Sequence, residues 1–213
     1  FYERVFRVLR ERAGRRQGEA DQLTREADFY PWPYDWRKSL VDTAQRLDQF
    51  VERLLDLHQD PDLRITLICH SHGCLAARYW WAFGGRDVLG VEAQHAAPPQ
   101  ERTPPAPHFP RRRNLGRLIL VGGPNLGTLK VMYDMTRGIV VLGVGLRYTA
   151  DFLFSMPPLY ESLPFEWDGR FIDEHDQPVT FDLFDPREWF RRRLGVFTRY
   201  PHMLDDERVR AFF

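Results

Sequence analysis

One serine, set between two histidines, is the residue whose surroundings best suit it to chemistry in this chain. Ser71 lies within the string Cys-His-Ser-His-Gly-Cys at 69–74. An apolar, β-branched run at 64–69 precedes it, and an apolar pattern typical of a helix follows at 74–81. A serine at a sharp turn from a buried strand into a helix forms a nucleophile elbow, which exposes the hydroxyl above the carboxyl end of a sheet. The pattern therefore predicts a nucleophilic serine.

The residues on either side of Ser71 agree with this interpretation. In an elbow, the residues two positions before and two positions after the serine must be small, because strand and helix approach closely there. Gly73 meets this requirement, and Cys69 is a small residue where glycine is commonest. The backbone N–H of His72 would point at the oxyanion that develops when a carbonyl is attacked. One such donor is typically worth ~3 kcal/mol in the transition state.

The same string is compatible with an incidental serine or with a metal site. In the first case the serine simply belongs to an ordinary strand–turn–helix. In the second, four soft-metal ligand types, Cys69, His70, His72 and Cys74, stand within six positions. Zinc sites usually take two ligands from each of two separated stretches, and alternation along a strand sends neighbouring side chains to opposite faces. We therefore predict no metal site and no cofactor.

Composition and charge exclude several other function classes. The chain has 213 residues, 43% of them apolar, which is enough for a hydrophobic core and excludes a disordered chain. Thirty basic residues balance 30 acidic ones, so no electrostatic signature of nucleic-acid binding is present. The arginine runs 111–113 and 191–193 are interpreted as solvated surface. The longest apolar run, 139–146, is far shorter than the ~20 residues of a membrane-spanning helix.

The elements that must position Ser71 alternate between helix and strand. Apolar residues recur at 3.6-residue spacing over 39–58 and predict a helix before the 64–69 strand. A second buried strand is predicted at 117–122. This alternation predicts an α/β fold with a parallel sheet. Further expectations are a basic amphipathic helix at 1–16, a short strand within 28–34, a Pro-rich loop at 98–110, a helical segment at 129–160 and a short strand at 178–183.

Three strings in order resemble the lecithin:cholesterol acyltransferase family of the α/β-hydrolase superfamily. They are Pro-Tyr-Asp-Trp-Arg at 33–37, the serine string at 69–74 and Gly-Gly-Pro-Asn-Leu-Gly-Thr at 122–128. The strings at 157–164 and 182–186 also resemble segments of bacterial members, so the resemblance covers about 29–190.

The resemblance implies an α/β-hydrolase-type, mostly parallel sheet with flanking helices and a lid or cap. It also implies a serine-dependent acyltransferase or lipase that acts on lipid esters through an acyl-enzyme on Ser71, with a Ser-His-Asp triad. The alternative is a catalytically inactive α/β-hydrolase-like module that binds a lipid or a partner.

We expect one domain over 1–213, with the core and its elbow at 1–128 and a lid- or cap-like segment at 129–213. Both ends fall inside helical patterns, so the chain is expected to be a fragment. The second oxyanion donor is then expected before Phe1, and the triad acid and histidine beyond Phe213. His202 is the alternative base within the chain, with Asp182 or Asp185 as its partner. The compartment stays open, with a lean toward the cytoplasm, and so does the oligomeric state.

Two further segments allow two interpretations each. The side chains of 34–37 either shape an acyl pocket or form a structural turn, and we favour the turn. The methionines and aromatic residues within 131–156 either line a lid or acyl groove or belong to the core.

Overall fold

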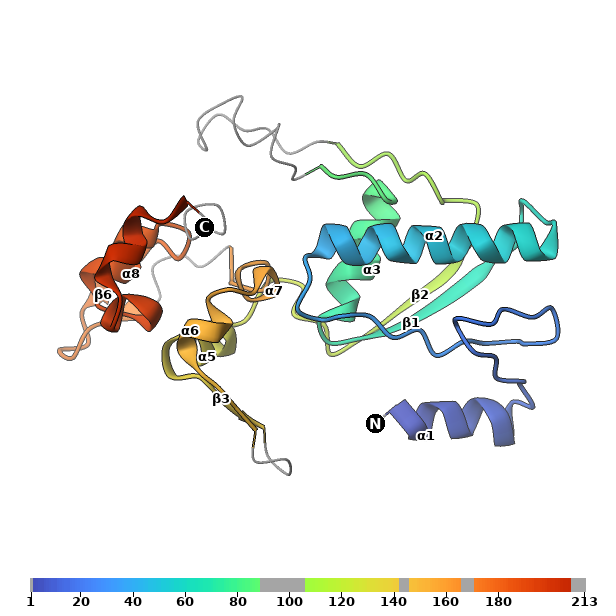
Figure 1. Cartoon of the computed structure of the whole chain (residues 1–213), viewed down its shortest axis with the longest axis horizontal. Coiled ribbons are helices and arrows are strands. Elements are labelled where there is room, and N and C mark those ends of the chain that lie inside the picture. Colours follow the sequence, from blue (N-terminus) through green and yellow to red (C-terminus); the bar gives the residue numbers. More distant parts are fainter. Residues whose placement is uncertain (1, 89–105, 142–145, 166–170, 208–213) are drawn as a thin grey trace. The chain divides into compact units, whose positions relative to one another are not determined.

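The computed structural model describes residues 2–88, 106–141, 146–165 and 171–207 (Figure 1). The chain divides into two compact units. The first comprises Phe1–Trp36 and Leu40–Val121, and the second comprises Arg37–Ser39 and Gly122–Phe213. Each unit contains a hydrophobic cluster of its own. The division of function between a core at 1–128 and a lid at 129–213 stays a prediction.

The first unit contains a parallel sheet, as predicted. Strand β1 (Ile65–His70) pairs in parallel with β2 (Leu115–Val121), from Ile65 opposite Leu115 to His70 opposite Val121. Parallel strands require a crossover connection, which here contains helix α3 (Gly73–Phe83). The predicted strand–turn–helix around Ser71 and the second strand are therefore confirmed.

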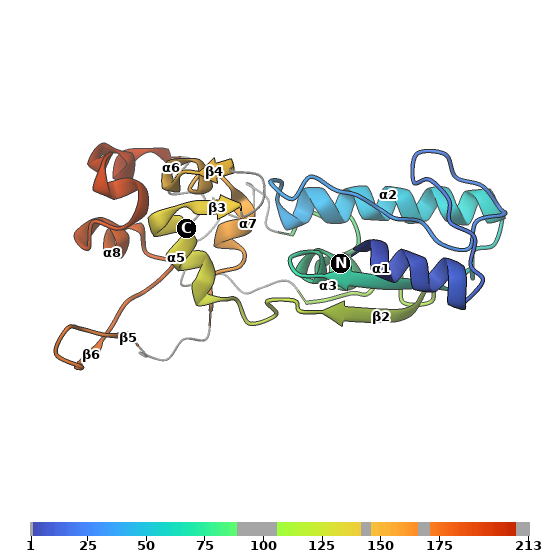
Figure 2. The ribbon, with the colours of Figure 1, turned by 90° about the horizontal axis from the view of Figure 1, so that it is seen from below.

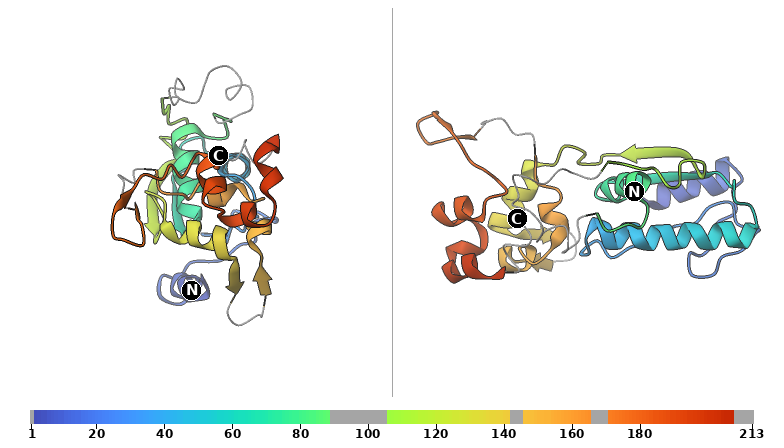
Figure 3. Two further views of the ribbon diagram at one scale, coloured as in Figure 1. Left: turned by 90° about the vertical axis from the view of Figure 1, so that its left-hand side faces the viewer. Right: turned by 90° about the horizontal axis from the view of Figure 1, so that it is seen from above.

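Helix α2 (Leu40–His58) begins directly after Ser39, at the predicted position. Figures 2 and 3 show α3 between α2 and the sheet, and α3 contacts both. The buried side chains of α2 repeat at helical spacing and meet α3 on one face. The cluster contains Val41, Ala44, Leu47, Val51, Tyr79 and Trp80.

The N-terminal segment differs from the prediction in two ways. Helix α1 (Tyr2–Arg7) continues as a π-helical turn, η1 (Val8–Arg12), and ends before the predicted position 16. Gly14, with a φ of +62°, takes the chain out of the helix. The predicted strand at 28–34 is wrong, because only an isolated parallel bridge joins Phe29 to Gln17. Pro31 and Pro33 lack the N–H groups that a ladder of hydrogen bonds would need.

The second unit begins with helix α5 (Leu129–Arg137), where the sequence predicts helix as far as 160. That prediction is wrong beyond Arg137. Gly138, with a φ of +80°, ends the helix, and an antiparallel hairpin of β3 (Ile139–Val141) and β4 (Leu146–Tyr148) follows. The run 139–141 consists of β-branched residues, which favour a strand over a helix.

Short elements complete the second unit. Two one-turn helices follow the hairpin, then a two-residue antiparallel pair, then a short helix and two 3₁₀ turns. They are α6 (Ala150–Leu153), α7 (Pro157–Tyr160), β5 (Phe171–Ile172), β6 (Pro178–Val179), α8 (Pro186–Arg191), η3 (Gly195–Thr198) and η4 (Pro201–Asp205). The strand predicted at 178–183 is thus present only in its first two residues.

Two remaining expectations concern segments without regular structure. The first part of the predicted Pro-rich loop, 98–105, lies outside the described residues, and 106–109 contains no helix or strand. Within the described residues, no helix is both long and apolar enough to cross a membrane.

Candidate active site

The backbone at Ser71 has the conformation that a nucleophile elbow requires. Its φ is +53°, in the left-handed region that non-glycine residues rarely occupy. The Ser71 N–H donates to the carbonyl of Val121 at 3.0 Å, so strand pairing extends up to the serine. The Cys74 N–H then donates to the Ser71 carbonyl at 2.9 Å and closes the turn. Ser71 is exposed at the carboxyl end of β1.

His72 lies at the N-cap of α3, with a φ of −56° and a ψ of −30°. Its carbonyl accepts from the N–H groups of Leu75 at 3.0 Å and Ala76 at 3.3 Å, which are the first bonds of the helix. The N-terminal end of a helix carries a partial positive charge from its aligned peptide dipoles. A negative charge that forms beside Ser71 would therefore be stabilised there.

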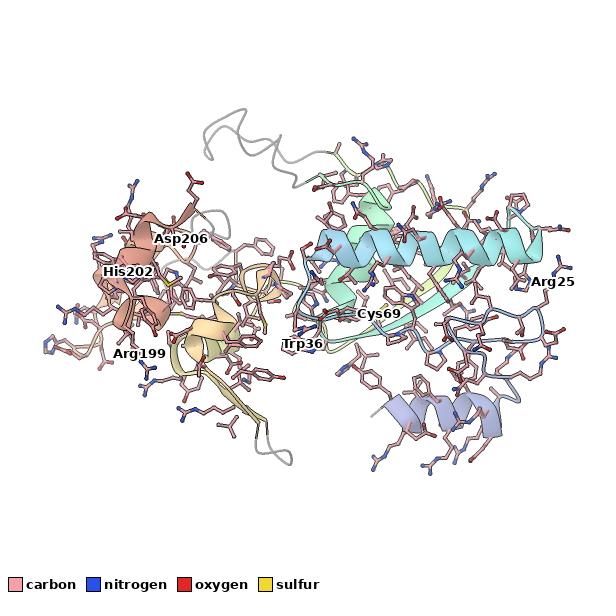
Figure 4. The ribbon with its side chains drawn as sticks, viewed as in Figure 1. Arg25, Trp36, Cys69, Arg199, His202 and Asp206 are labelled. Atoms are coloured by element: carbon pink, nitrogen blue, oxygen red, sulfur yellow. The ribbon has the colours of Figure 1, made fainter. Side chains whose placement is uncertain are left out.

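The two cysteines of the elbow are held as neutral thiols. The Cys74 thiol is buried and donates to the carbonyl of Cys69 at 3.3 Å and to that of Val121 at 3.6 Å. Burial raises the pKa of Cys69 to about 12 and also raises the pKa of Cys74. A thiol is a poor nucleophile compared with its thiolate, so neither cysteine competes with Ser71 at neutral pH. Figure 4 labels Cys69 near the end of β1.

The histidines and cysteines of the elbow are not arranged as metal ligands. Across the part of the chain that the structure describes, no group of three or more histidines, cysteines or acids is placed to hold a metal ion. His70 instead makes a hydrogen bond between its Nδ1 and the Tyr2 hydroxyl at 3.0 Å. This contact joins α1 to the last residue of β1.

An aromatic side chain from the segment before α2 packs against the elbow. The Tyr34 ring is half-buried and stacks on Trp32, with ring centroids 5.9 Å apart and planes 21° apart. On its other side it meets the His72 ring at 6.4 Å. A Cβ atom added to Gly73 would lie 3.4 Å from the Tyr34 hydroxyl oxygen. Sequence reasoning placed Tyr34 in a structural turn and missed this contact, whose only signal was the family-like string at 33–37.

The triad candidates within the chain lie in the second unit and are not paired with one another. His202 is exposed on η4, with its ring edge-on to Tyr200 at 6.1 Å (Figure 4). Asp182 accepts from the Phe184 N–H at 2.9 Å, and Asp185 caps α8 by accepting from the Arg187 N–H at 2.9 Å. Among the described residues, His202 forms no hydrogen bond or ion pair with either aspartate. The identity of the triad base stays a prediction.

The methionine- and aromatic-rich stretch within 131–156 is divided between core and surface. Met135, Phe154 and Met156 are buried in the cluster of the second unit. Tyr133 and Phe152 are exposed, at 62% and 41%. Core packing therefore accounts for the first three residues, and a lid stays a prediction.

Comparison with known proteins gives one family. Residues 23–142 match the family described as lecithin:cholesterol acyltransferase. No curated protein and no solved structure matches the chain. The matched residues include β1, Ser71, α3 and β2, and the family implies the α/β-hydrolase fold and acyltransferase- or lipase-like activity on lipid esters. Because the match covers more than half of the chain, this protein belongs to the lecithin:cholesterol acyltransferase family.

Proposed function

We propose that this protein is a serine-dependent enzyme that transfers or hydrolyses the acyl group of a lipid ester, with Ser71 as its nucleophile. The observation that carries the proposal is the φ of +53° at Ser71, at the turn between β1 and α3. Holding a non-glycine residue in this region costs on the order of 1–3 kcal/mol. Glycine would avoid the cost, so a serine at this position indicates that its hydroxyl has a use.

The reaction follows from what surrounds the hydroxyl. The Ser71 oxygen attacks the ester carbonyl carbon as its proton passes to a general base, and the carbonyl oxygen becomes an oxyanion beside the His72 N–H. The tetrahedral intermediate collapses, the bond to the leaving alcohol breaks, and that alcohol takes the proton from the base. An acceptor alcohol or water then attacks the acyl-enzyme. An alcohol completes a transfer, and water completes a hydrolysis.

Labelling with a fluorophosphonate probe tests this assignment, because the probe phosphonylates activated serines. We expect the full chain to be labelled and Ser71→Ala to lose the label. Ser155→Ala is the matched control, because Ser155 is also exposed but donates its hydroxyl to the Phe152 carbonyl at 2.7 Å. Circular dichroism shows whether each variant is folded. Labelling of Ser71→Ala equal to that of the parent chain would refute Ser71, and a folded parent that takes no label would favour the inactive lipid- or partner-binding module.

A further inference from the structure

We propose that Tyr34 is a positioning residue of the elbow, whose ring fixes the His72 N–H and the first turn of α3 without touching the substrate. The inference rests on the proposed function, since it explains how an oxyanion donor beside Ser71 is held in place. It assigns a role in acyl transfer to a segment that precedes α2 and lies more than 30 positions before the serine.

The Tyr34 ring contacts the elbow on the side of the two residues that follow the serine. It lies against the His72 imidazole with a ring-centroid distance of 6.4 Å and an interplanar angle of 31°. Its hydroxyl oxygen, Cε1 and Cζ would lie 3.4, 3.7 and 3.9 Å from a Cβ on Gly73. Behind it, the Trp32 indole stacks on the ring and is itself 6.2 Å from Phe50 of α2. The elbow is thus supported through two aromatic rings by the longest helix of the first unit.

The ring, rather than the hydroxyl, makes this support. Within the described residues, no hydrogen bond joins the Tyr34 hydroxyl to another group. Burial raises the pKa of Tyr34 to about 12, so the side chain stays neutral over the range in which an esterase would be assayed. The packing contacts are therefore the ones to remove, and phenylalanine would keep most of them.

The spacing at Gly73 defines how much room the ring leaves. Contacts of 3.4–3.9 Å are ordinary van der Waals distances, so a methyl group at position 73 fits against Tyr34. A side chain that extends beyond Cβ would have to displace the ring or tilt the start of α3. Both residues that set the position of the His72 N–H, the one before it and the one after it, lie at this turn.

The first test measures the elbow directly and does not depend on activity. Hydrogen–deuterium exchange of the peptide 71–76 reports how firmly the turn is held. We expect Tyr34→Leu to increase this exchange about tenfold or more and Tyr34→Phe to leave it within about twofold of the parent chain, because only the first removes the ring. Tyr30→Leu is the matched control: Tyr30 is also half-buried, packs against Phe50 at 5.9 Å and lies away from the elbow contacts.

Equal exchange in the parent and Tyr34→Leu, or equal increases in Tyr34→Leu and Tyr30→Leu, would overturn the proposal. Should Tyr34→Leu fail to fold, position 73 examines the same contact from the other side. Gly73→Ala is expected to behave like the parent, and Gly73→Leu to increase exchange at 71–76. Combining Gly73→Leu with Tyr34→Ala should restore part of the protection, because the two sites share one space. Gly73→Leu indistinguishable from Gly73→Ala would also overturn the proposal.

The second test links the contact to acyl transfer. The rate of fluorophosphonate labelling is expected to fall ~10- to 100-fold in Tyr34→Leu, since a misplacement of about 1 Å at a reacting group can cost ~100-fold. The rate should recover in Tyr34→Phe and stay unchanged in Tyr30→Leu. If the parent chain takes no label, the proposed function fails, while the exchange measurements still decide whether Tyr34 holds the elbow. Normal labelling of Tyr34→Leu, with the parent labelled, would overturn only the role of Tyr34.

Discussion

At the scale of single residues, Ser71 combines a reactive group with an unfavourable backbone conformation. The hydroxyl belongs to a residue whose φ of +53° is costly for any side chain with a Cβ. The hydrogen bonds from Ser71 to Val121 and from Cys74 to Ser71 hold that conformation on both sides. Stability is therefore expected to improve when the serine is replaced by glycine, at the expense of the chemistry.

Two variants that both remove the hydroxyl separate strain from chemistry. We expect Ser71→Gly to be more stable to urea than Ser71→Ala by about 1 kcal/mol, because only glycine accepts a positive φ without a Cβ clash. Both should lack fluorophosphonate labelling. Equal urea midpoints for the two variants would mean that the turn is relaxed in solution and that the backbone gives no support to the nucleophile assignment.

At the scale of elements, the sequence predicted the parts of the fold whose patterns are local. The β-branched run before Ser71 and the apolar periodicity over 39–58 each point to one structure, and both predictions are confirmed. The apolar run after Gly138 is compatible with either helix or strand by periodicity alone, and the prediction of a helix there is wrong. The contact between Tyr34 and Gly73 depends on how α2 and the sheet pack, so no local pattern could reveal it.

A second element-scale feature corrects the expectation that the arginine run 111–113 is solvated. Arg111 is half-buried and donates from two nitrogens to Asp48 of α2, at 2.9 and 3.1 Å, and to Glu52 at 2.5 Å. The Trp80 indole N–H of α3 also donates to Asp48, at 2.9 Å. This network joins α2, α3 and the segment that leads into β2, so it fixes the crossover on which the parallel sheet depends.

Removing the arginine should therefore destabilise the first unit. We expect Arg111→Leu to lower the free energy of unfolding by about 2 kcal/mol, since it leaves a partly buried carboxylate without its charged donor. Arg112→Leu is the matched control, because its neighbour in sequence is exposed and has no ion pair among the described residues. Urea denaturation of both variants at neutral pH measures the difference. Equal losses would mean that the Asp48–Arg111 pair adds nothing beyond a surface charge.

The same pair predicts how stability depends on pH. Burial acts to raise the pKa of Asp48, but the hydrogen bonds from Arg111 and Trp80 outweigh it and lower that pKa. A carboxyl whose pKa is lowered by folding contributes stability above its unfolded value, about 3.9, and loses it as the pH falls through the folded value. The stability gap between the parent chain and Arg111→Leu should thus be largest near neutral pH and shrink below about pH 4. A gap that stays constant down to pH 3 would contradict this assignment.

At the scale of the whole molecule, two hydrophobic clusters divide the chain, and the candidate nucleophile belongs to the first unit. The cluster of the second unit is aromatic, with Phe154 edge-on to Trp189 at 5.6 Å and to Phe197 at 6.0 Å. Gly195 lies directly beside this cluster with a φ of +56°, and a Cβ there would collide with the Phe154 ring. Glycine is required at this position for both conformation and space.

This geometry allows one core to be damaged while the other is left intact. We expect Gly195→Ala to destabilise the second unit by about 3 kcal/mol, since it combines a strained φ with overpacking of a filled core. Hydrogen–deuterium exchange should increase in α6 and α8 and stay unchanged in α2 and at 71–76, because the altered site packs within the second cluster. Fluorophosphonate labelling of Ser71 then measures what the second unit contributes to the reaction. Increased exchange in both units together would show instead that the two clusters unfold as one cooperative structure, and the division into a catalytic core and a lid would lose its physical basis.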